Sequence, residues 1–465
     1  METIALWLSR TSDYIYLYIL VFMLVFCGLY FSFRTKFAQI KLFPNAVKLI
    51  SEKTSDSKKV SAFQALMICT ASKVGTANIA GVATAIAIGG PGSMFWMWIM
   101  AVIGCASSMA EATLAQIYKT KHGDNFVGGP AYYIHKALNL KWLGKIFSGL
   151  FLFCFLFGFN SLQAHNMSSS LKYYIKNYEN TCWPYLIGIL FAVGVLYVVL
   201  GGIKRIGFVT SYLVPIMSCL YILLGLGIII ANFSRIPEVL SYIISSAFDF
   251  KAILGGTGGN AILIGVKRGL LSNEAGMGSA PNAAATADTS HPAKQGIIQI
   301  LSVFIDTVLI CSTSAFIVLF SNVNINKDII GMPLMQKVMH SYLGEFGVHF
   351  ITFSIILFAF SAIVGNFGFC EPNILFINNN EKFIKFIRIL GILPIIFGCI
   401  TSSSVAWDLA DISMALIAIL NIIIILLLSN KYLVCFKDYI SQKKLGLNPV
   451  FNSEKNNIKT EFWKD

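Results

Sequence analysis

Apolar residues run through this chain in long, nearly continuous segments. Segments of about 20 apolar residues recur over the whole length, and a helix needs that length to cross a hydrocarbon core of about 30 Å. They lack the alternation of barrel strands, and helices are the other structure that satisfies the backbone in lipid. The pattern therefore predicts eleven membrane-spanning helices, over residues 14–33, 61–88, 93–118, 143–170, 184–202, 207–232, 258–285, 296–320, 346–378, 384–401 and 406–429.

Composition and charge agree with a multi-pass protein of the cell membrane. The chain is 56% hydrophobic and 12% charged, whereas soluble domains carry roughly 25% charged residues. Its net charge of +13 is concentrated in the loop after the first segment, from Arg34 to Lys59, and in the tail from Lys431 to Lys464. Basic residues collect on the cytoplasmic side of membrane proteins. We therefore expect the N-terminus outside and the C-terminus in the cytoplasm. The bilayer is the expected partner, with no nucleic acid and no obligatory protein partner.

Two of the eleven segments are interrupted by glycine and polar residues. The interruptions read "KVGTANIAG" (Lys73 to Gly81) and "KRGLLSNEAGMGSAP" (Lys267 to Pro281). Each segment opens a block of five, over residues 61–232 and 258–429, and an odd number of crossings makes the second block enter from the opposite side. Glycine-interrupted helices at matching positions are typical of inverted-topology repeats. Outside the repeats, residues 1–60 hold an extra transmembrane helix and a basic cytoplasmic loop, and residues 430–465 form a basic cytoplasmic tail.

The interruptions predict a binding site near the middle of the membrane. Unwound backbone at that depth is tolerated where it lines a cavity or binds a ligand. The half-helix that begins near Asn78 directs its free N–H groups at an anion, while free carbonyls and the Asn78 amide oxygen suit a small hard cation. A carboxylate together with a sodium ion fits both halves. The alternative is a glycine-lined packing seam between helices.

Four motifs carry a resemblance to a known family. They are "GTANIAGVATAIAIGGPG", "GGPGSMFWMWIMAVIG", "RGLLSNEAGMGSAP" and "VAWDLAD". Between about Phe33 and Leu428 the chain resembles the alanine/glycine:cation symporter family. The resemblance implies an all-α polytopic membrane protein with a leucine-transporter-like fold, in which a 5+5 inverted repeat carries one extra N-terminal helix. It also implies sodium-driven import of small neutral amino acids, with sodium as co-substrate, no cofactor and no enzymatic activity.

The resemblance also assigns substrate-binding residues. Gly75, Thr76 and Ala77 at the first interruption would offer backbone N–H groups to the substrate carboxylate. Gln163, in "SLQAHN", corresponds to a glutamine whose amide meets the polar groups of the substrate.

Sodium coordination is the implied role of Val74, Asn78 and Ser361, the last in "AFSAIVGN". The alternative is a proton-coupled amino-acid transporter, in which Asp306 or Glu371 would relay the proton.

Three positions depart from the family pattern. Ala362 stands where a threonine hydroxyl would be, Leu271 where a phenylalanine would be, and Asn366 where a tryptophan would be. If Leu271 and Asn366 line the cavity, the site gains room and hydrogen-bonding capacity together. We then expect serine or glutamine to be transported at least as well as alanine. The alternative is that Phe367 or Phe369 refills the space.

Charged residues near the interruptions call for partners, because charges inside a membrane are costly. Lys267, Arg268 and Glu274 are expected to clamp the second unwound segment; gating by pairing and separating is the alternative. Glu111 or Glu274 is the expected partner of Lys73.

Two other classes of protein fit the sequence less well. A channel would show rings of charge or repeated filter loops. An intramembrane enzyme would need a nucleophile–base pair or a metal-ligand set in its core, and neither HExxH nor GxSxG occurs.

Overall fold

The computed structural model describes residues 2–52, 59–123, 125–249, 259–326 and 328–463. The first half contains α1 (Glu2–Ile15), η1 (Tyr16–Leu20), α2 (Val21–Arg34), α3 (Ala38–Lys41), α4 (Phe43–Leu49), α5 (Ala62–Lys73), η2 (Thr76–Asn78), α6 (Ala80–Gly89), α7 (Gly92–Ile117), β1 (Thr120–His122), β2 (Asn125–Val127), α8 (Pro130–Leu138), α9 (Lys141–Leu152), η3 (Phe153–Phe159), α10 (Asn160–Ser170), η4 (Leu171–Tyr173), η5 (Tyr178–Asn180), α11 (Trp183–Val199) and α12 (Gly202–Ala231). The second half contains η6 (Phe233–Arg235), α13 (Ile236–Ala247), α15 (Gly259–Asn273), α16 (Ala280–Ala284), α17 (Pro292–Val303), η7 (Phe304–Cys311), α18 (Ser312–Phe320), α19 (Gly331–Ile377), α20 (Glu381–Leu390), α21 (Leu393–Ile400), α22 (Ser403–Leu427) and α23 (Ser429–Lys444).

The helices confirm an all-α polytopic membrane protein. In the described ranges, eight helical segments are long and apolar enough to cross a bilayer, and the bent pair α5 and η2–α6 raises the number to nine. Of the remaining predicted crossings, 184–202 is the shorter apolar helix α11, and 258–285 is divided between α15 and α16. The leucine-transporter-like 5+5 arrangement with eleven crossings stays a prediction.

The predicted crossing 346–378 is part of a longer helical element. α19 consists of two helices that meet at Gly344, where φ is 58° and ψ is −145°. Glycine adopts this left-handed conformation without steric cost. The predicted segment therefore begins just after the break, and the more polar helix before Gly344 was missed.

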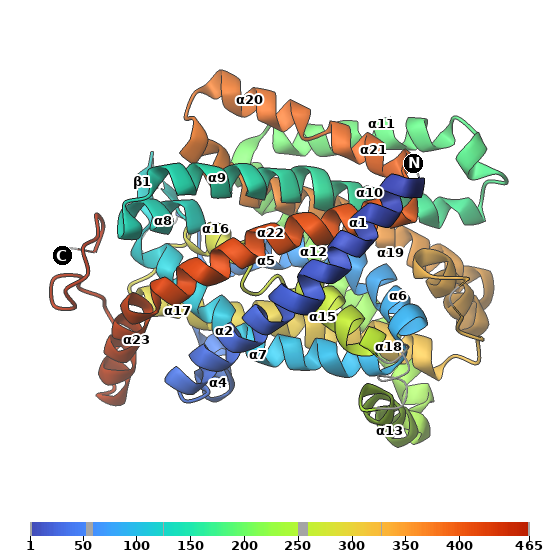
Figure 1. Cartoon of the computed structure of the whole chain (residues 1–465), viewed down its shortest axis with the longest axis horizontal. Helices are drawn as coiled ribbons and strands as arrows, with labels where there is room; N and C mark the ends of the chain where they lie inside the picture. The colour runs from blue at the N-terminus through green and yellow to red at the C-terminus, as the bar shows by residue number, and fades with distance from the viewer. Residues whose placement is uncertain (1, 53–58, 124, 250–258, 327, 464–465) are drawn as a thin grey trace.

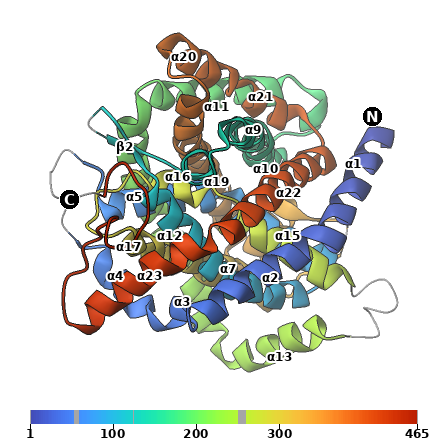
Figure 2. The same cartoon turned by 60° about the vertical axis from the view of Figure 1, so that its left-hand side comes forward.

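Helices from both halves of the chain surround the two interrupted segments. Figure 1 shows α9, α11, α20 and α21 along the upper side and α7, α15 and α17 along the lower side. The N-terminal helix α1 packs on α22 near the C-terminal end of the chain, and both cross in front of the interior in Figure 1. Figure 2 brings α23 forward, on the same side of the molecule as α3 and α4.

Exposure separates a lipid-facing layer from a polar interior. On the outer helices α11 and α12, Leu190 is 75% exposed and Ile230 is 70% exposed, as expected for side chains that contact lipid. Every residue of α17 is buried, although this helix carries Lys294, Gln295 and Gln299. Polar chemistry is therefore concentrated inside the bundle.

Candidate functional site at the interrupted helices

The first interruption is a break in the helix. α5 starts with a capping box between Ser61 and Gln64 and ends at Lys73. Gly75 is extended, with φ −131° and ψ −161°, and the chain resumes helical structure at an angle of 61°. Thr76 is completely buried, so its backbone groups need partners inside the protein.

The structure brings three of the predicted substrate residues together. The backbone N–H of Thr76 donates to Oε1 of Gln163 at 2.8 Å, and a Cβ added to Gly75 would lie 2.5 Å from Nε2 of Gln163. Asn166, one turn further along α10, donates from Nδ2 to the Thr76 hydroxyl at 2.8 Å. Ala77 is buried in the same turn. The amide oxygen of Gln163 thus accepts from the Thr76 N–H, which the resemblance assigned to the substrate carboxylate.

Asn78 lies in a buried cluster of oxygen atoms that joins both interrupted helices. Its Oδ1 accepts from the N–H of Gly75 at 3.2 Å, and its Nδ2 donates to Oδ1 of Asp306 at 2.5 Å. The other carboxylate oxygen of Asp306 accepts from the hydroxyls of Ser272 and Thr307. Asp306 is completely buried on the π-helical segment η7. A carboxylate beside two hydroxyl oxygens is suitable chemistry for a small hard cation, and the Asn78 amide now presents its nitrogen to that carboxylate.

The three predicted sodium ligands fall into two places. The Ser361 hydroxyl donates to the carbonyl of Phe358 at 3.1 Å and lies 3.7 Å from the sulfur of Met217, whereas Asn78 bonds to Asp306. Val74 is completely buried at the end of α5, next to Gly75, where an added Cβ would lie 3.0 Å from the Cβ of Ala362. The resemblance to a family grouped these ligands, and in the described ranges the hydrogen bonds of Asn78 and of Ser361 go to different partners.

Both polar ends of the Asn366 side chain are engaged by the protein. Its Oδ1 accepts from the Ser72 hydroxyl at 2.5 Å, and its Nδ2 donates to Asn160 at 2.9 Å. Leu271 is 5% exposed, within the main apolar core. The hydrogen-bonding capacity that Asn366 adds is therefore already partly used within the protein.

Phe367 and Phe369 could fill the space left where Leu271 and Asn366 replace larger side chains, but each packs on a part of the chain other than α15. Phe367 lies against Gly391 after α20, and Phe369 packs on Phe155 of η3 with ring centroids 5.8 Å apart.

Glu111 supports the second interruption, a role that the sequence did not predict. Its carboxylate accepts from the N–H groups of Gly276 at 3.3 Å and Gly278 at 3.0 Å, and from Nδ2 of Asn421 at 2.8 Å. Glu274 has φ 53°, which is uncommon for a residue other than glycine. Glu111 drew attention in the sequence because charges inside a membrane are costly. Its contact with Gly276 and Gly278 is visible only in the tertiary structure.

Lys267 and Arg268, two of the three residues of the expected clamp, are held in ion pairs with carboxylates from other helices. Arg268 makes a bidentate pair with Asp411 at 3.1 and 3.2 Å, and Lys267 pairs with Asp13 at 2.7 Å. These contacts attach α15 to α22 and to the N-terminal helix. Glu274 takes part in neither pair.

Lys73 also lacks the ion pair expected for it. Its side-chain nitrogen is buried and has no hydrogen-bond partner in the described part of the chain. Glu111 is committed to the second interruption instead.

Glu371 is paired away from the interruptions. It contacts Arg388 at 2.6 Å, and both residues line a cavity of about 550 Å³ beside β2 and α20. An ion pair accounts for its charge, so Asp306 is the better placed of the two candidate proton relays.

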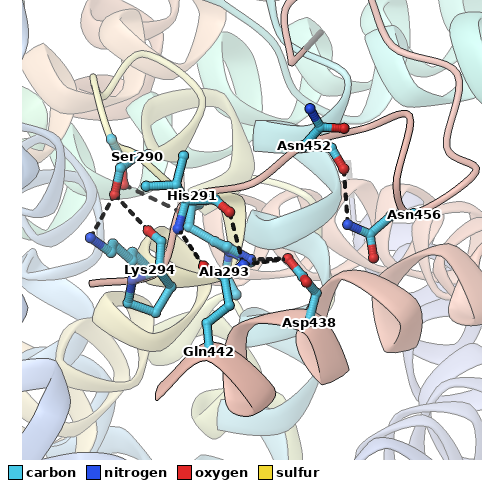
Figure 3. A network of polar contacts seen from close by, with 11 residues as sticks. Ser290, His291, Ala293, Lys294, Asp438, Gln442, Asn452 and Asn456 are labelled. Atoms are coloured by element: carbon cyan, nitrogen blue, oxygen red, sulfur yellow. Dashed lines mark hydrogen bonds and ion pairs between the residues drawn. The ribbon is translucent and has the colours of Figure 1, made fainter. Parts of the chain in front are cut away.

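The C-terminal segment covers the beginning of α17 (Figure 3). Nδ1 of His291 accepts from the N–H of Ala293 at 3.1 Å, and its Nε2 lies 3.2 Å from Oδ2 of Asp438 on α23. Burial lowers the pKa of His291 below its usual 6.5, in agreement with a neutral ring whose Nδ1 is an acceptor. Lys294 contacts Asn448 at 2.7 Å.

Comparisons with known proteins cover nearly the whole chain. The model of the sodium:alanine symporter family matches residues 1–453. The chain is 42% identical to the amino-acid carrier protein AlsT of Bacillus subtilis, over 98% of this chain and 96% of that protein. It is 42% identical to the probable sodium/glutamine symporter GlnT of the same organism, over 97% and 94% of the two chains. It is 36% identical to the sodium/alanine symporter AgcS of Methanococcus maripaludis, over 89% and 92%.

Proposed function

Because the chain belongs to the sodium:alanine symporter family, whose members are transporters and not enzymes, we propose that it imports small neutral amino acids together with sodium by alternating access. The observation that carries the proposal is the junction at the first interruption. The N–H of Thr76 is the proposed contact of the substrate, and Asn78 bonds to Asp306, the proposed contact of the ion. Both residues belong to the same three-residue turn, η2.

The substrate carboxylate binds at the interrupted α5–α6 helix. It accepts from the backbone of Gly75, Thr76 and Ala77, and it replaces the Gln163 oxygen that now accepts from Thr76. The released amide of Gln163 then donates to the substrate. Exchanging one oxygen acceptor for another keeps the buried N–H partnered in both states, which limits the cost of emptying the site.

Sodium binds beside Asp306. The oxygens of Asp306, Ser272 and Thr307 supply the donor set, and the fixed negative charge offsets the dehydration of the ion. The amide oxygen of Asn78 joins this set when it exchanges the N–H of Gly75 for the ion. Val74 and Ser361 are a second place for an ion, at the contact between α5 and α19.

The basic tail after residue 430 lies in the cytoplasm, and the two interrupted helices open the halves of the inverted repeat. Both statements rest on charge distribution and break positions.

The transported amino acids include alanine and extend to serine or glutamine. Two observations support this range: Leu271 and Asn366 replace larger aromatic residues of the family pattern, and relatives of similar identity are named for alanine and for glutamine.

Uptake into proteoliposomes tests the proposal. We expect uptake of labelled alanine to require a sodium gradient and to carry net charge, because a zwitterion moves with a cation. Preloaded unlabelled amino acid should accelerate entry of label, which a channel would not show. Equal uptake in sodium and choline buffers would refute sodium coupling, and acceleration at low pH in choline would favour the proton-coupled alternative.

A further inference from the structure

One face of α17 and η7 carries polar side chains along its length. Gln295, Gln299, Ser302 and Asp306 recur at intervals of four, three and four residues, which is close to the 3.6 residues of a helical turn. All four are completely buried. They form a stripe that begins one turn inside the end of α17 covered by α23 and ends at Asp306. We call it the α17 stripe.

The α17 stripe is not satisfied by neighbouring protein groups. The amide nitrogen and oxygen of Gln295 and the hydroxyl of Ser302 have no hydrogen-bond partner among the residues that the structure describes. The amide of Gln299 has only the weak partner offered by the neighbouring Cys69 thiol of α5 within the same described ranges. Buried polar groups in native proteins are nearly always bonded, to protein or to ordered water. Three successive side chains of the stripe carry polar atoms that the described protein groups do not satisfy, and this indicates that water solvates the stripe.

Further unmet groups lie where the stripe approaches the site. α17 packs against α5, whose last residue Lys73 has an unpartnered buried ammonium, and one oxygen of Glu274 is likewise unpartnered within the described ranges. Lys73 lies within electrostatic range of Glu111, Glu274 and Asp306.

We propose that the α17 stripe is a hydrated lane through which the cation held at Asp306 leaves toward the face that carries α23. This proposal rests on the proposed function, because it takes Asp306 as the cation site. Amide and hydroxyl oxygens replace part of the hydration shell as the ion moves. The network of His291, Lys294 and Asp438 lies at the outer end of the lane (Figure 3).

The decisive variant is Gln299→Leu, with Gln299→Asn as its matched control. Net sodium-driven uptake requires sodium to be released, whereas exchange of amino acid at equal, saturating sodium on both sides does not. We expect Gln299→Leu to raise the barrier to sodium release and so to lower the rate of net uptake about tenfold. The rate of exchange should be unchanged. Gln299→Asn, which keeps an amide, should leave both rates unchanged.

A purely structural role for Gln299 would lower net uptake and exchange together, and that result would overturn the proposal. Unchanged net uptake in Gln299→Leu would also overturn it. If uptake by the wild-type protein did not depend on sodium, the proposed function would be refuted, and the sodium lane with it.

Cysteine labelling tests the lane without relying on the folding of Gln299→Leu. Ser302→Cys is made in a background without the exposed Cys182 and Cys219, which serves as the blank. Ile300→Cys, two residues away and therefore on the opposite face of the helix, is the control. A small cationic methanethiosulfonate should modify Ser302→Cys, and sodium should slow the reaction. An unreactive Ser302→Cys, or equal reaction of Ile300→Cys, would overturn the proposal.

Discussion

Replacing Asn78 by alanine should weaken sodium binding without unfolding the protein. The change removes the 2.5 Å bond to Oδ1 of Asp306 and the 3.2 Å bond from the N–H of Gly75. A hydrogen bond to a charged group contributes about 1.5–3 kcal/mol. If the bond to Asp306 sets the geometry of the carboxylate, the apparent affinity for sodium should fall roughly ten- to hundredfold.

The assay is the sodium dependence of alanine uptake in proteoliposomes, together with the yield of folded protein after purification. We expect Asn78→Ala to be recovered in normal yield and to need roughly ten- to hundredfold more sodium for half-maximal uptake, so that uptake vanishes at ordinary sodium concentrations. Asn232→Ala is the control, because the side-chain amide of Asn232 donates to the carbonyl of Ile228 at the end of α12. A wild-type sodium dependence in Asn78→Ala would refute the reasoning and reduce the interruption to a packing feature.

Three further predictions concern the substrate and the tail. Gln163→Leu removes the acceptor of the Thr76 N–H, so the KM for alanine should change by about tenfold or more; an unchanged KM would remove Gln163 from the site. Serine and glutamine should compete with labelled alanine at least as well as unlabelled alanine does, and a preference of about tenfold or more for alanine and glycine would refute the prediction that Leu271 and Asn366 enlarge the substrate cavity. Burial lowers the pKa of His291, so the folded state binds fewer protons than the unfolded state just below pH 6.5. The stability of this region should therefore fall as the pH falls below 6.5, because protonation of Nδ1 removes the acceptor of the Ala293 N–H. Hydrogen-exchange protection of residues 445–463 should fall accordingly, and protection that is independent of pH would exclude His291 as the cause.

The local pattern of the chain was sufficient for the membrane class and for the positions of the breaks. Hydrophobic length reflects the thickness of the bilayer, and glycine with polar residues inside such a segment marks unwound backbone wherever the rest of the fold lies. The same locality drew attention to the interruption and to Asn78 within it, whereas the roles of Gly75 and Thr76 came from the resemblance to a family. Gln163 came from the resemblance to a family, since nothing around it in the sequence relates it to Thr76.

The tertiary structure decided which distant side chains complete the site. Asp306 lies 228 residues from Asn78, and Glu111 lies 165 residues from Gly276. No periodicity within a segment encodes such pairings, because they depend on how whole helices cross. For the same reason the sequence did not reveal that Arg268 pairs with Asp411. Hydrophobicity determines that a segment lies in the membrane, whereas helix packing determines which of its faces meets which partner.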